Sequence, residues 1–180
     1  MKPRSIAPLL TAPILAALAL AAAPAAAQTS PPAAPAPTSA PAPGSVTIKG
    51  PGGVSAVVSA TDLRDMHRFS VTVPWGGGHT YAGAALSDLL AEVGAPSEAR
   101  LHGPPLDQVV IVKGRDGFIA VLAMAETAMS FKGQPVILAD TEDGKPLNDK
   151  EGPYRLVIGG ELKPPRSVWG VVGIELRPVK

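Results

Sequence analysis

The amino-acid sequence predicts a mainly β domain of the α+β class, with two or three short helices. Short runs rich in valine and isoleucine recur along the chain and are separated by glycine- and proline-containing turns, a pattern typical of strands. A clear helical period is confined to residues 85–93. Because the chain contains no cysteine, a hydrophobic core must stabilise this domain without disulfide bonds.

The clearest strand runs from Phe69 to Trp75, where apolar residues alternate with serine, threonine and proline, so one face should be buried. Two hairpins are expected where short glycine-containing turns, Gly50–Gly53 and Arg115–Gly117, join neighbouring strands. The strands that we expect are residues 46–49, 54–59, 69–75, 109–112, 118–122, 135–139, 154–158 and 171–177.

Three short helical segments are expected between these strands. Thr61 is the candidate N-cap of a helix over residues 62–66. Leucines at helical spacing predict a helix over residues 85–93, with Gly94 as its C-cap. A helical turn is expected over residues 123–129.

Two loops are expected to interrupt the regular structure. Gly76–Gly78 should be a loop, since three successive glycines form regular structure only at a high entropic cost. Residues 140–147 are polar and contain Asp143–Gly144, a turn signal, so we expect a loop there as well.

The first 27 residues have the features of a cleavable signal peptide. Lys2 and Arg4 give a basic start, a leucine- and alanine-rich run follows, and Ala25 and Ala27 form the small-x-small motif of a cleavage site. We place the cleavage after Ala27. Prolines interrupt the apolar run and no basic cluster follows it, which argues against a membrane anchor. The sequence therefore predicts a periplasmic protein without a stable membrane anchor.

The next segment, residues 28–44, consists almost entirely of proline, alanine, serine and threonine. Such a composition has little to bury, so we expect a disordered spacer. The folded part, residues 45–180, then holds about 135 residues, which is typical of one domain.

The charge balance limits the classes of partner. The chain has 16 basic and 15 acidic residues; Lys2 and Arg4 lie in the signal peptide, which leaves 14 basic residues and a net charge of −1. This balance argues against a nucleic-acid partner and against binding to an anionic membrane surface. The absence of cysteine excludes thiolate ligation and thiol redox chemistry.

An ordered set of short motifs carries a resemblance to a known family. The motifs are Tyr81–Leu90, Arg115–Phe118, Glu126, Val136–Asp140, Asp143–Leu147, Glu151–Ile158, Val168–Trp169 and Ile174–Leu176. In this order and spacing they resemble the oxidoreductase molybdopterin-binding domain of the sulfite oxidase family, especially its short, exported, stand-alone versions. The likeness covers most of residues 45–180. It implies a sulfite-oxidase-type fold with mixed sheets. In full members, a cysteine thiolate binds molybdenum, and arginines and histidines hold the pterin phosphate.

The sequence departs from this family at the metal ligand. The resemblance places the cysteine in or just after the strand that ends at Trp75, but residues 71–75 read Val-Thr-Val-Pro-Trp. A carboxylate or hydroxyl is a poor substitute for thiolate at a soft-ligand site. We therefore predict no catalytic residue, no metal site and no bound cofactor; only the resemblance implies molybdopterin.

Five residues are candidates for ligand binding: Trp75, His79, Arg115, Asp116 and Arg155. Trp75 and His79 flank the three glycines, whose loop could close over a ligand. The other three are polar residues within the motifs that carry the resemblance.

A structural role is the alternative for part of this set. An arginine on a partly buried strand needs a carboxylate partner, because an unpaired buried charge is too costly. Glu126, Asp140 and Arg155 are therefore predicted to form a structural polar network.

Three functions remain open. The favoured one is a non-catalytic binding or accessory module, which binds a small anion, a pterin-like ligand or a periplasmic protein. The second is a molybdopterin-dependent oxidoreductase with altered metal ligation or a partner subunit. The third is a structural envelope domain that makes protein contacts.

Overall fold

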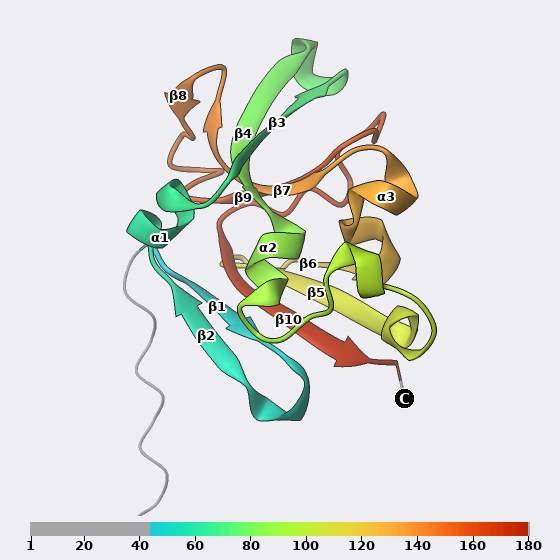
Figure 1. Cartoon of the computed structure of the whole chain (residues 1–180). Helices are drawn as coiled ribbons and strands as arrows, with labels where there is room; N and C mark the ends of the chain where they lie inside the picture. Colours follow the sequence, from blue (N-terminus) through green and yellow to red (C-terminus); the bar gives the residue numbers. More distant parts are fainter. Residues whose placement is uncertain (1–43, 180) are drawn as a thin grey trace, which may run out of the picture. The chain divides into compact units, whose positions relative to one another are not determined.

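Two five-stranded sheets make up the part of the chain that a computed structural model describes, residues 44–179 (Figure 1). The predicted signal peptide and nearly all of the predicted spacer lie outside these residues. No helix within residues 44–179 is long and apolar enough to cross a membrane. The mainly β α+β class with mixed sheets and short helices, predicted from the sequence, is confirmed.

The first sheet has the order β2-β1-β10-β5-β6. Both predicted hairpins lie in it, β1 with β2 and β5 with β6, and β1 also pairs in parallel with the last strand, β10. Antiparallel pairing of β10 with β5 completes the sheet. The strands of this sheet are β1 (Val46–Lys49), β2 (Ser55–Val58), β5 (Gln108–Gly114), β6 (Ile119–Ala123) and β10 (Val171–Pro178).

The second sheet has the order β3-β4-β7-β8, and β9 also pairs with β7. Its strands are β3 (Arg68–Val73), β4 (His79–Ala85), β7 (Val136–Glu142), β8 (Lys145–Pro146) and β9 (Arg155–Ile158). The expected loop over residues 140–147 is wrong in part, because β7 continues to Glu142 and forms a hairpin with β8.

The sequence did not indicate strand β4, whose second half consists of alanine and glycine. Gly83 is required there because a Cβ atom at this position would come within 2.0 Å of the Leu138 carbonyl oxygen. The β4 backbone can therefore approach β7 closely only where the side chain is missing.

The helices are short. Helix α1 begins after Ser59, whose hydroxyl and backbone N–H form a capping box with Asp62, so Ser59 and not Thr61 is the N-cap. The predicted helix at 85–93 is the shorter α2, and α3 follows the predicted helical turn, η5. The helices are α1 (Ala60–Asp65), α2 (Leu86–Ala91) and α3 (Met129–Lys132), with 3-10 turns η1 (Pro51–Gly53), η2 (Trp75–Gly77), η3 (Glu98–Arg100), η4 (Pro104–Asp107) and η5 (Met124–Thr127).

The second sheet carries apolar residues on both faces. One face joins the main core, to which Leu138 of β7 and the buried leucines of α2 belong. The other face holds a small separate cluster around Tyr81, with Ile137 of β7 among its members. In this cluster the Tyr81 ring lies beside Trp75, which follows β3, with 5.6 Å between the ring centroids.

Candidate functional site

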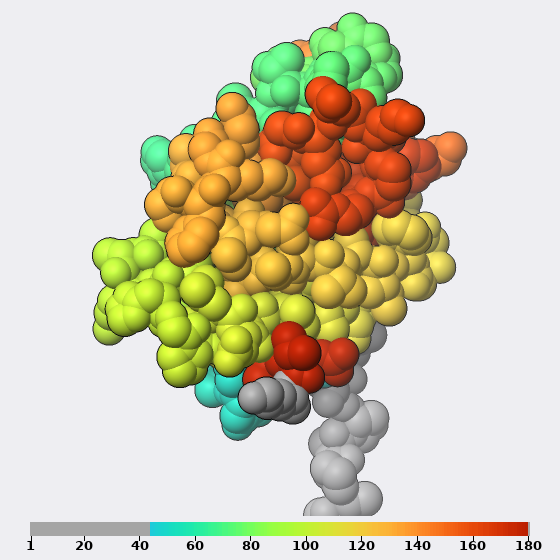
Figure 2. Space-filling model, turned by 90° about the vertical axis from the view of Figure 1, so that its right-hand side faces the viewer, coloured from blue at the N-terminus to red at the C-terminus, as the bar shows by residue number. Residues whose placement is uncertain are grey.

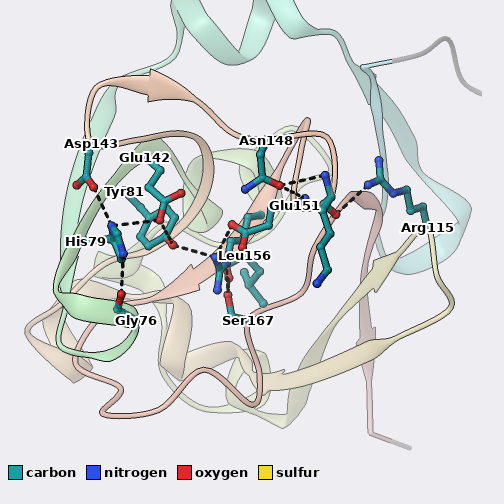
Figure 3. Close-up of polar contacts among 12 residues, drawn as sticks. Gly76, His79, Tyr81, Arg115, Glu142, Asp143, Asn148, Glu151, Leu156 and Ser167 are labelled. Atoms are coloured by element: carbon teal, nitrogen blue, oxygen red, sulfur yellow. Dashed lines mark hydrogen bonds and ion pairs between the residues drawn. The ribbon is translucent and has the colours of Figure 1, made fainter.

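Arg155 on β9 is the centre of the candidate site, and its side chain is almost completely buried. Its Nη1 donates to the Tyr81 hydroxyl at 2.8 Å and to the Glu151 carboxylate at 2.6 Å (Figure 3). Its Nε donates to the Ser167 hydroxyl at 2.8 Å, and that hydroxyl donates to the Leu156 carbonyl. Glu151 therefore compensates the buried positive charge from only four residues away.

Aromatic rings enclose the Arg155 guanidinium. Its central carbon lies 4.8 Å from the ring centroid of Trp75, 4.9 Å from that of Tyr81 and 5.5 Å from that of Trp169. Lys150 places its ammonium 4.9 Å from the Trp169 ring. Cation–π attraction is strongest where water is excluded, so these rings add to the stabilisation from Glu151.

A line of polar contacts runs from Arg155 to the surface. The Tyr81 hydroxyl donates to Glu142 at 2.7 Å, and Glu142 lies 3.4 Å from Nδ1 of His79. Burial and the bond to Glu142 raise the pKa of Tyr81, so this phenol stays protonated. Figure 3 shows this line continuing through His79 to Asp143 and to the Gly76 carbonyl.

His79 and Asp143 form the exposed end of this line. His79 Nδ1 lies 2.7 Å from Asp143, and this contact, followed by the one to Gly76, raises the pKa of His79. Asp143 also accepts a hydrogen bond from the Thr80 backbone N–H at 2.9 Å, which, with His79, lowers the pKa of Asp143. Both groups are therefore favoured in their charged forms.

Arg115 lies in the turn between β5 and β6, and its side chain contacts the loop that precedes β9. It donates to the carbonyl oxygens of Gly152 at 2.9 Å and Lys150 at 2.8 Å, and also to that of Asp149. Arg115 thus holds the backbone of the loop whose Glu151 side chain binds Arg155. These three side-chain hydrogen bonds all go to backbone carbonyl oxygens of the protein.

Asp116 does not join the cluster. Its carboxylate accepts the Phe118 backbone N–H at 2.9 Å and stabilises the turn between β5 and β6. Phe118 itself is 45% exposed, in agreement with its position at a hairpin turn.

The three members of the predicted structural network form three separate contacts. Glu126 pairs with Arg166 at 3.0 Å, and Asp140 pairs with Arg68 at 2.5 Å. Arg155 contacts neither carboxylate and pairs instead with Glu151. The sequence shows that a buried arginine needs a carboxylate, but the fold decides which one.

The structure adds residues that the sequence did not single out for the site. Glu151 could have been found from its spacing of four residues to Arg155, which brings it within reach across the intervening turn. No local signal points to the others, because the fold brings them together from distant segments. They are Tyr81, Glu142, Asp143, Lys150, Ser167 and Trp169.

The space-filling view shows how these segments meet at the surface. The loop between β9 and β10, drawn orange-red, lies between the green β3–β4 hairpin and the yellow β5–β6 hairpin (Figure 2). Ser167 and Trp169 come from this loop, and Trp75 comes from the tip of the green hairpin.

The residues present do not fit molybdenum bound through a pterin cofactor. β3 ends at Val73, which is buried, and Pro74 and Trp75 follow it, so the donors there are not thiolate. Within residues 44–179 no three histidine, cysteine, aspartate or glutamate side chains are grouped to hold a metal ion. Four arginines, Arg68, Arg115, Arg155 and Arg166, are already bound to carboxylates or carbonyl groups of the protein.

Comparison with known proteins supports the fold. No family profile matches this chain, and no curated protein matches its sequence. Among solved structures, the sulfane dehydrogenase SoxCD from Paracoccus pantotrophus superposes with a TM-score of 0.55 at 22% identity. The match covers 75% of this chain and 39% of that chain. The chain therefore shares the fold of part of this dehydrogenase and spans about two fifths of the matched protein.

Proposed function

We propose that this chain is an exported, periplasmic binding or accessory module that uses a molybdopterin-related fold without oxidoreductase catalysis. The observation that carries the proposal is the end of β3, where Val73, Pro74 and Trp75 stand in place of a thiolate ligand. Beside it, the Arg155 charge is compensated by Glu151. The buried centre of the site thus forms part of the protein's own core.

The proposed ligand binds at the rim of this centre. The rings of Trp75 and Trp169 are partly exposed and offer stacking surfaces, while Lys150 offers positive charge. Stacking together with positive charge suits a small anion or a planar, anionic pterin-like group. A periplasmic protein that presents an acidic or aromatic side chain would satisfy the same rim.

The likeness to a sulfane dehydrogenase supports a second candidate, an oxidoreductase whose metal ligand is unusual or comes from a partner subunit. The third candidate, a structural envelope domain, is supported by the edge strand β6. Its residues Ile119 and Val121 are each 50% exposed, and a strand at a sheet edge with apolar side chains is prone to protein contacts.

Metal and pterin content test the proposal. The full chain is expressed with its own leader in cells that make the cofactor, and a known molybdopterin enzyme produced in the same cells serves as the loading control. Molybdenum is measured by elemental analysis, and pterin by oxidation to its fluorescent form. We expect the control to carry both and this chain to carry no molybdenum. Near-stoichiometric metal and pterin would instead establish the oxidoreductase.

A binding measurement then identifies the role of the rim. Molybdate, sulfate and a soluble pterin are titrated into the purified protein, and the intrinsic fluorescence of Trp75 and Trp169 reports binding. We expect one of these probes to change the fluorescence, and the change to be lost in Lys150→Ala. If none of them binds, and an envelope protein is captured through Ile119 and Val121, the third candidate is correct.

A further inference from the structure

The tip of the β3–β4 hairpin connects Trp75 to His79 through three glycines. Gly76, Gly77 and Gly78 all have positive φ angles, of 70°, 108° and 87°. Residues other than glycine adopt a positive φ angle only at an energetic cost. Glycine adopts it freely, but it also leaves the loop free to take up other backbone conformations. The Trp75 ring also packs against Tyr81, and contacts that hold the adjoining loop add to those that keep the ring over Arg155.

His79 provides two of these contacts. Its Nε2 lies 2.8 Å from the Gly76 carbonyl oxygen, inside the loop, and its Nδ1 lies 2.7 Å from the Asp143 carboxylate, in the turn between β7 and β8. The imidazole thus joins the glycine loop to a second hairpin.

Both partners of this ring are acceptors. A carbonyl oxygen can only accept, and Asp143 is ionised because its pKa is lowered by the Thr80 N–H and by His79. A neutral imidazole has one N–H and can serve only one of them, whereas the imidazolium serves both. The observed geometry therefore belongs to the doubly protonated ring.

We propose that His79 is a pH-dependent latch, which holds the glycine loop and Trp75 over Arg155 when its ring is doubly protonated and releases them when it is neutral. The inference deepens the proposed function, on which it rests, because it assigns a regulator of access to that site. Release of the loop exposes more of the Trp75 face to a ligand at the rim.

The charges around His79 set the direction of the switch. Glu142 and Asp143 face the ring from β7 and its turn, Lys145 on β8 acts on Asp143, and the Tyr81 ring on the same strand lies 6.5 Å away. The two carboxylates favour the imidazolium and raise the pKa of His79 above its ordinary value of 6.5. The latch is closed below this raised pKa and opens as the pH rises through it.

Two measurements on the full chain, without added ligand, test the latch between about pH 5 and pH 9. The first is the pair of ¹⁵N chemical shifts of the His79 ring. The second is acrylamide quenching of Trp75 in a Trp169→Phe background. We expect one titration midpoint above that of a free imidazole, and a roughly twofold rise in quenching at the same midpoint.

His79→Gln should be readily quenched at every pH, because both donors of the neutral glutamine amide are on one nitrogen and cannot replace the two ring nitrogens that face Asp143 and Gly76. His102→Gln, a change at an exposed histidine outside the site, is the matched control and should retain the transition. The latch is disproved if quenching does not change with pH, or if His79→Gln keeps the transition. If Trp169→Phe does not fold, the indole N–H signal of Trp75 in the wild-type chain provides the same test.

The two proposals can fail separately. A missing transition would remove the latch and leave the binding role intact, because ligand titration is a different measurement. Stoichiometric molybdenum would overturn the binding module, and the response of the loop to pH would still be measured on the protein as it is.

Discussion

Arg155 and His79 lie at the two ends of one line of polar contacts, but the protein holds them in different ways. Arg155 is buried, and the fold supplies Glu151, Tyr81 and Ser167 as fixed partners. His79 is partly exposed, and it can donate to both Asp143 and the Gly76 carbonyl only while its ring is charged. The inner end is thus a permanent part of the fold, and the outer end depends on the solvent.

Removing the inner carboxylate should have the largest effect. Glu151→Ala leaves the Arg155 charge buried without its partner, and we expect a loss of about 3 kcal/mol in the free energy of unfolding. Urea denaturation measures this value. Lys113→Ala, which breaks the exposed ion pair with Glu175, is the control and should cost less than about 1 kcal/mol. Equal losses in the two variants would show that Arg155 is not effectively buried.

Removing the connecting hydroxyl should have an intermediate effect. Tyr81→Phe keeps the ring against Arg155 but deprives Glu142 of a donor and Arg155 of an acceptor, at an expected cost of about 1–2 kcal/mol. Thermal unfolding followed by circular dichroism gives the comparison. The matched change at the surface, Thr72→Val, removes an exposed hydroxyl contact with Thr80 and should alter stability by less than about 0.5 kcal/mol.

The outer end should give the smallest effect, and one that depends on pH. The folded-state pKa of His79 is raised, so its contribution to stability is present below the unfolded pKa and is lost as the pH rises through the folded value. The folded-state pKa of Asp143 is lowered, so its contribution is present above its unfolded pKa and is lost as the pH falls through the folded value.

The difference in melting temperature between the wild type and His79→Gln, measured from about pH 5 to pH 9, isolates the contribution of the imidazole to stability. We expect the wild type to be the more stable protein under mildly acidic conditions and the difference to shrink toward alkaline pH. A constant difference would mean that the charge on His79 does not contribute to stability.

Periodicity in the sequence was sufficient to predict much of the fold. The alternation from Phe69 to Trp75 predicts β3, and the turn at Arg115–Gly117 predicts the β5–β6 hairpin. Strand β4 could not be predicted in this way, because its residues Ala82–Ala85 have weak strand propensity and Gly83 lies too close to β7 for a side chain.

The candidate site was harder to predict than the fold. Trp75, His79 and Arg155, taken from motifs far apart in the sequence, lie along one line of contacts. Their partners Tyr81, Glu142 and Trp169 could not be assigned, since the partner of a buried charge depends on which segments the tertiary fold brings together. Export, cleavage after Ala27 and the spacer at residues 28–44 stay predictions.

The parallel pairing of β1 with β10 has a consequence for the order of events during synthesis. Thr47 lies opposite Gly173, so the ladder between β1 and β10 forms only after β10 has left the ribosome, whereas the β1–β2 hairpin can form early. Contacts between such distant residues form slowly, because a long loop must close first. A chain that cannot complete its first sheet until its last strand exists folds late, as the export predicted from the sequence would require.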